Sequence, residues 1–161
     1  MKTPALHELK KELQLLPAAD LAEICLSLAR YKKDNKEYLT YLLLESYDKS
    51  GFVKEVREEL TSSFSEINSG TNLYYAKKTL RKILRQMTKF SRYVNDKAVT
   101  CELHLHFCRC LKDSGLPYQE SQQLVNLYAQ QLKKITKLIS AMHEDLQNDY
   151  QRDYLELGGH E

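Results

Sequence analysis

Residues 96–111 carry the most constraining pattern in the sequence, because apolar and cysteine side chains cover nearly the whole circumference of this segment when it is drawn as a helix. These positions are Ala98, Val99, Cys101, Leu103, Leu105, Phe107, Cys108, Cys110 and Leu111. Only Glu102, His106 and Arg109 share a narrow polar strip. A helix of this kind is buried, and the segment is shorter than the roughly 20 apolar residues that cross a bilayer. We therefore predict a central buried helix at 96–111, with the other helices packed around it.

The composition favours helices over a sheet for the rest of the chain. The 161 residues fit one domain, and five glycines and three prolines leave few places for tight turns. Hydrophobic residues make up 42% and charged residues 29%, which is an ordinary globular balance. We predict a single all-α domain over 1–157, followed by a frayed C-terminal tail at 158–161.

Helix start and stop signals divide the chain into about seven helices. The signals are Pro4, Pro17, Asp20 with Glu23, Asp34 with Glu37, Ser50-Gly51, the polar loop 68–72, Asp96, and Gly115 with Pro117. Arg30-Tyr31 before Asp34 also corresponds to Arg92-Tyr93 before Asp96. This similarity predicts stacked αα-hairpins, arranged as an irregular α-superhelix or as a helical bundle.

The last predicted helix starts near Tyr118 and is long. Apolar positions continue in heptad stepping at Val125, Tyr128, Leu132, Ile135, Ile139, Met142 and Leu146. Such a helix either crosses the whole domain or pairs with a second copy of the chain. Residues 144–161 carry six acidic side chains and one arginine, so the end of the chain is strongly acidic.

The segment 73–94 has the opposite charge, with seven basic residues and no acidic one. Its apolar positions recur every three or four residues and form the seam, the face by which a helix packs on its neighbours. Five cations recur at the same spacing on another face. We call these five residues the basic stripe: Lys78, Lys82, Arg85, Lys89 and Arg92. A row of cations with tyrosines near its ends is a candidate site for an anion or for nucleic acid. The alternative is a solvated face that meets acidic neighbours, for which 144–161 is the obvious candidate.

Metal binding is the less favoured interpretation of the cysteines. Cys101, His104 and Cys108 converge on one helix face, and Cys25 or His143 from another helix could complete a zinc site. The close Cys-x-x-Cys pairs typical of structural zinc are absent from the sequence. We therefore expect buried, inert thiols, with no metal and no cofactor.

Catalysis is also disfavoured by the sequence. Glu102, His106 and Arg109 could act together only if another helix completed a cleft around them. No segment resembles a glycine-rich phosphate loop or a nucleophile elbow. We predict that the protein is not an enzyme.

These observations favour a non-enzymatic helical interaction or scaffold module. Tyr31, Tyr38, Tyr41 and Tyr47 are residues of the kind that anchor interfaces. The alternative is that these tyrosines cover the core. The expected partner is a protein or peptide, or a second copy that pairs through the long C-terminal helix. The alternative function is weak, sequence-independent nucleic-acid binding through the basic helix 73–94. The chain shows no signal peptide and no long apolar run, so we expect a cytoplasmic location and no membrane contact.

Overall fold

The computed structural model describes residues 2–159, and within this range the protein is all-helical. The helices are α1 (Leu6–Gln14), α2 (Ala18–Tyr31), α3 (Lys33–Thr40), α4 (Lys49–Phe64), α5 (Leu73–Val94), α6 (Lys97–Asp113), α7 (Gln122–Ile139) and α8 (Glu144–Glu156), with a π-helical turn at Tyr41–Glu45 and a 3-10 turn at Tyr118–Glu120. The all-α prediction is confirmed, with eight α-helices in the described residues where about seven were expected.

The chain divides into two compact units, Met1–Tyr47 and Asp48–Glu161. We call them the N-terminal unit and the C-terminal unit and describe each by itself. The prediction that 1–157 forms a single domain stays a prediction.

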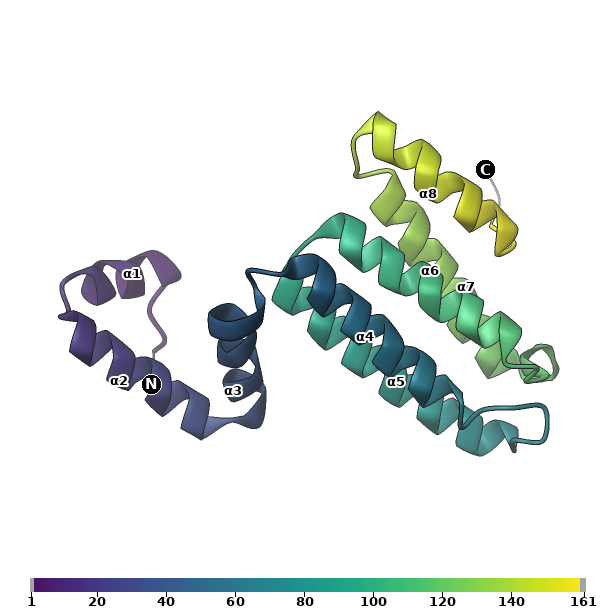
Figure 1. Ribbon diagram of the computed structural model, residues 1–161, viewed down its shortest axis with the longest axis horizontal. Coiled ribbons are helices and arrows are strands. Elements are labelled where there is room, and N and C mark those ends of the chain that lie inside the picture. The colour runs from purple at the N-terminus through teal and green to yellow at the C-terminus, as the bar shows by residue number, and fades with distance from the viewer. Residues whose placement is uncertain (1, 160–161) are drawn as a thin grey trace. The chain divides into compact units, whose positions relative to one another are not determined.

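The N-terminal unit contains α1, α2 and α3 (Figure 1). Its helices bury almost no side chains. Lys32 alone connects α2 to α3, and its extended backbone turns the chain back into the predicted hairpin. The side-chain amide of Asn35 donates a hydrogen bond to the carbonyl oxygen of Leu28 at 2.9 Å and fixes this turn. No residue of α1, α2 or α3 is buried, and Tyr41 is the only buried residue among those described in this unit.

The C-terminal unit is built around α6, which packs against α4, α5, α7 and α8 (Figure 1). Five of its side chains are almost completely inaccessible: Cys101, Leu103, Phe107, Cys108 and Leu111. Apolar residues of all four surrounding helices join them in one hydrophobic cluster. The predicted central buried helix is confirmed. The central position of α6 follows from its sequence, because a helix that is apolar on most of its circumference needs neighbours on most sides.

The start of α6 is fixed by Asp96, as the sequence predicts. The Asp96 carboxylate accepts hydrogen bonds from the backbone N–H groups of Ala98 at 2.8 Å and Val99 at 3.2 Å, which satisfies two donors of the first helical turn. Just before it, Asn95 adopts the left-handed conformation with φ of 51° and ends α5. Lys49 of α4 forms an ion pair with the same carboxylate and lowers the pKa of Asp96.

The prediction of one long C-terminal helix is wrong, because the helical path breaks between Ile139 and Glu144. The hydroxyl of Ser140 donates to the carbonyl oxygen of Lys137 at 3.1 Å and helps to end α7. The ring of His143 then accepts a hydrogen bond from the backbone N–H of Asp145 at 3.4 Å and caps α8. The self-association predicted through a single long helix therefore loses its structural basis.

Folding back lets α8 bury side chains that a continuous helix would leave in solvent. Tyr154 and Leu157 belong to the core cluster beside α6 and α7. The hydroxyl of Tyr128 donates to the carbonyl oxygen of Leu157 at 2.7 Å. The hydroxyl groups of Thr136 and Tyr154 form a hydrogen bond at 2.8 Å. The heptad pattern of apolar residues continues across this break in the sequence, because Met142 in the turn is itself partly buried against the core.

Gly158 and Gly159 belong to the end of α8. Gly158 has a φ of 90°, and its N–H donates to the carbonyl oxygen of Leu155, while the N–H of Gly159 donates to that of Tyr154. This pair of bonds is the Schellman motif that commonly ends helices at glycine. Residues 160–161, the rest of the predicted frayed tail, lie outside the described residues.

We predict that replacing Phe107 by alanine lowers the free energy of unfolding by about 3 to 5 kcal/mol. The Phe107 ring is fully buried and meets the Phe64 ring edge-on, with centroids 5.2 Å apart, so its removal leaves a cavity. Urea titrations followed by circular dichroism would measure the change. Leu155→Ala is the control, because Leu155 of α8 is 42% exposed and should cost less than about 1 kcal/mol. A similar small loss for Phe107→Ala would contradict the central position of α6.

Candidate anion-binding surface

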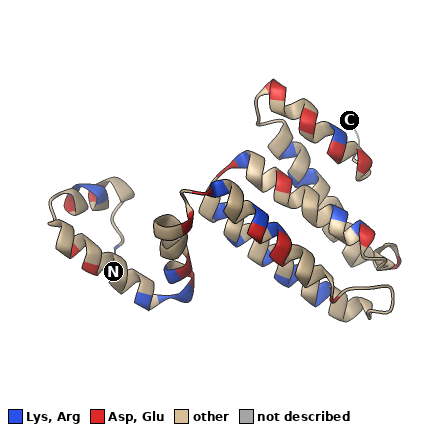
Figure 2. Ribbon diagram, viewed as in Figure 1, with Lys and Arg blue, Asp and Glu red and all other residues tan. Residues whose placement is uncertain are grey.

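The basic stripe lies on the outer side of α5. The seam residues of α5, including Leu80, Ile83 and Met87, are buried in the core of the C-terminal unit. Four residues of the stripe are exposed: Lys78, Lys82, Arg85 and Arg92. They form no ion pair with other described residues, and blue positions follow α5 in Figure 2.

Two aromatic rings lie beside the stripe. The ammonium group of Lys78 is 4.6 Å from the centroid of the Tyr74 ring. Lys89 is half-buried, and its ammonium group is 5.4 Å from the centroid of the Phe90 ring. Cation–aromatic contacts of this kind keep a cation positioned without neutralising its charge.

The described part of the acidic end does not supply the acidic neighbours that the alternative interpretation of the stripe requires. Helix α8 packs against α6 and α7 and, in Figure 1, lies on the side of the unit away from α5. Its carboxylates pair with Arg109 of α6, at 3.5 Å for Asp153 and 3.9 Å for Glu156. The described part of the acidic segment therefore leaves the stripe uncovered.

A cleft of about 520 Å³ opens at the C-terminal end of the stripe. Its wall combines Arg92 of α5, Lys97 of α6, and Lys134 and Lys137 of α7. Of these four cations, only Arg92 was singled out from the sequence. The two lysines of α7 come from a segment more than 40 residues further along, and no local pattern connects them with α5.

The buried ring of His104 also lines this cleft. Burial and the nearby Lys134 charge lower the pKa of His104 from its ordinary value of 6.5 to about 4, so the ring is neutral at pH 7. The side chain of Gln131 forms a hydrogen bond with the ring, and this hydrogen bond opposes the shift. The His104 Nδ1 atom and the Gln131 Oε1 atom have no other partner in the described residues.

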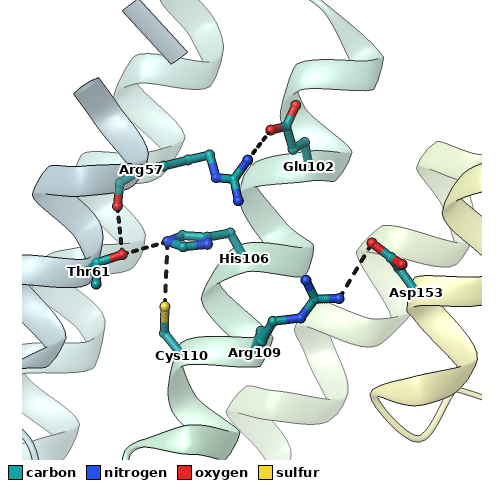
Figure 3. Close-up of polar contacts among 7 residues, drawn as sticks. All are labelled: Arg57, Thr61, Glu102, His106, Arg109, Cys110 and Asp153. Atoms are coloured by element: carbon teal, nitrogen blue, oxygen red, sulfur yellow. Dashed lines mark hydrogen bonds and ion pairs between the residues drawn. The ribbon is translucent and has the colours of Figure 1, made fainter. Parts of the chain in front are cut away.

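The polar strip of α6 forms a set of contacts between helices (Figure 3). Glu102 pairs with Arg57 of α4 at 2.7 Å and has no direct bond to His106. The Thr61 hydroxyl donates its proton to the carbonyl oxygen of Arg57, so it accepts from the Nε2–H of His106, 2.9 Å away. Burial and the Arg57 charge lower the pKa of His106. The Cys110 sulfur lies 3.5 Å from the same Nε2 atom, so this nitrogen is in contact with side chains of both α4 and α6.

The cysteines of α6 behave as core residues. Burial raises the pKa of both the Cys101 and the Cys108 thiol to about 12, and neither sulfur forms a disulfide. Within residues 2–159, no three His, Cys, Asp or Glu side chains are grouped so that they could hold a metal ion. No helix in the same range combines the length and apolar character needed to cross a membrane.

We predict that His104 makes the protein less stable in acid. The pKa of His104 in the folded state is below the ordinary value. The contribution of His104 to the free energy of unfolding is therefore complete above pH 6.5 and is lost as the pH falls toward 4. The loss should be on the order of 3 kcal/mol. Unfolding titrations of the wild type and of His104→Leu at several pH values would measure it as the difference between the two profiles. His7→Leu, at an exposed position of α1, is the matched control. Parallel profiles for wild type and His104→Leu would refute the prediction.

Comparison with known proteins adds no further guide to the surface described above. Searches against protein-family models, curated proteins and solved structures find no match to this chain.

Proposed function

We propose that the protein is a non-enzymatic helical interaction module that binds a protein partner through the N-terminal unit. The observation that supports this proposal is the amount of apolar surface in residues 1–47. Leu6 is 84% exposed, Leu43 69% and Tyr47 86%. Further exposed apolar residues of this unit are Leu9, Leu13, Leu15, Leu16, Ile24, Leu26, Leu28, Tyr31, Leu42 and Leu44. Large exposed apolar surfaces of this kind mark interaction sites.

The N-terminal unit also needs such a partner for its own stability. Ordering a residue costs about 1 to 2 kcal/mol of conformational entropy, and this cost is normally offset by apolar burial. With only one buried residue described in the unit, its own helices supply little of that burial. Docking on a protein surface would provide the remainder.

A second copy of the chain is the partner that the charges favour. Residues 1–47 contain seven basic and seven acidic side chains, so two copies can approach without net repulsion between these units. The same neutrality gives this unit no attraction for a polyanion. A cytoplasmic location, also part of the proposal, agrees with the free thiols of Cys101 and Cys108.

Self-association would be measured by sedimentation of the full chain over a concentration range from about 1 μM to about 1 mM. We expect a monomer–dimer equilibrium that is weakened at least about tenfold by the paired change Leu43→Ser and Leu44→Ser, because both side chains are well exposed. Leu155→Ser, an exposed leucine of the C-terminal unit, is the control and should leave the equilibrium unchanged. A chain that stays monomeric throughout the range would rule out the second copy.

Nucleic-acid binding along α5 is a second candidate, favoured by the exposed and uncovered stripe. Cations spaced along one helix face can follow a phosphate backbone without reading sequence. Tyr74 and Tyr75, at the start of α5, are exposed and offer rings on which unpaired bases could stack.

For this candidate, titration of fluorescent single-stranded DNA at several salt concentrations is the measurement. Changing Lys78, Lys82 and Arg85 to serine should weaken binding and reduce the salt slope by about 2 to 3. The matched control changes Lys10, Lys11 and Lys36, three exposed lysines of the N-terminal unit, to serine. Equal effects of the two triple changes, or no binding by the wild type, would exclude a nucleic-acid site on α5.

A further inference from the structure

The cleft between α5, α6 and α7 concentrates positive charge from separate parts of the chain. Arg92, Lys97, Lys134 and Lys137 converge on it from three helices. Lys97 donates a hydrogen bond to the carbonyl oxygen of Ala141 at 3.4 Å, and the other three form no ion pair with described residues. Cations gathered in this way repel one another, and an anion in the cleft would relieve that repulsion.

Among the described residues, Asp96 is the one carboxylate in the wall of the cleft, and its charge is already paired. It accepts from two backbone N–H groups of α6 and pairs with Lys49 of α4. The ion pair leaves the four cations of the wall without compensation. The cleft therefore presents a net positive charge.

The ring of His104, which is 5% exposed, also lines the cleft. Its partner among the described residues is the side chain of Gln131, with which it forms a hydrogen bond. A neutral imidazole nitrogen can donate to a phosphate oxygen or accept from a hydroxyl group, depending on its tautomer. A ligand in the cleft would therefore lie beside this ring.

Three hydroxyl groups in the wall indicate what else the ligand carries. The hydroxyls of Thr88, Ser91 and Thr100 each donate their proton to a backbone carbonyl oxygen, at 2.7 to 2.9 Å. Their oxygen atoms keep lone pairs that can accept hydrogen bonds. The wall thus combines cations for a phosphate with acceptors for hydroxyl groups, in a volume of the size that small-molecule sites have.

We propose that this cleft binds a small phosphorylated molecule that also carries hydroxyl groups, such as a nucleotide or a sugar phosphate. Arg92, Lys134 and Lys137 hold the phosphate, and the hydroxyl oxygens of α5 and α6 accept from the body of the ligand. The site is independent of the partner surface proposed for the N-terminal unit, and sedimentation and ligand titration test the two separately.

Nuclear magnetic resonance of the full chain provides the test, with the imidazole nitrogens of His104 as reporters. The probes are inorganic pyrophosphate, ADP and glucose 6-phosphate, with uncharged adenosine as the comparison. We expect saturable shifts of His104 with the phosphorylated probes, and weak or no shifts with adenosine. Stronger binding of ADP would assign a nucleotide, and stronger binding of glucose 6-phosphate would assign a sugar phosphate.

Two neighbouring lysines of α7 supply matched variants. Lys134 lines the cleft, whereas Lys133 is exposed and lies outside it. Lys134→Ser should weaken binding at least about tenfold, because it removes a charged partner of the phosphate. Lys133→Ser should leave the affinity within about twofold, because an exposed charge outside the site is screened by solvent. His104 resonances and melting temperatures of the unliganded variants would show that each one folds.

Three results would overturn the proposal. One is the absence of saturable shifts up to about 10 mM of every phosphorylated probe. Another is equal weakening by Lys133→Ser and Lys134→Ser, which would indicate attraction to the overall charge. The third is adenosine binding as strongly as ADP, which would mean that the phosphate contributes nothing.

Discussion

The burial of α6 on most of its circumference is the constraint on which the C-terminal unit depends. A helix with one apolar stripe needs one neighbour, but α6 is contacted by α4, α5, α7 and α8 together. This requirement explains why the chain breaks after Ile139 and returns as α8, because a continuous helix would leave part of α6 in water. The polar strip fits the same arrangement, since Glu102 and Arg109 find their partners on α4 and α8.

The two units differ in how much of their apolar surface is buried. The C-terminal unit buries its large side chains in one cluster, whereas the N-terminal unit leaves leucines of α1, α2 and the π-helical turn exposed. Charge is divided just as unevenly within the C-terminal unit, where cations follow α5 and carboxylates gather on α8 (Figure 2). Exposed apolar surface and exposed cationic surface therefore lie in different parts of the chain.

Local patterns in the sequence predicted the helices well, because capping and periodicity act over a few residues. The start of α6 at Asp96, the seam of α5 and the buried face around Phe107 all follow from such patterns. The break before Glu144 was missed because Met142 keeps the heptad stepping and the signals of the turn are a serine and a histidine. The cleft was missed for another reason. Lys134 meets Arg92 only after α7 has packed on α6, and no spacing in the sequence encodes that meeting.

Arg92 belongs both to the basic stripe and to the wall of the cleft, so the two proposed anion sites would compete for it. A phosphate seated in the cleft neutralises a charge that a polyanion on α5 would also need. By thermodynamic reciprocity, each ligand would then lower the affinity of the other by the same factor. Two sites that share a guanidinium group form a negatively coupled pair, without any change in the positions of the helices.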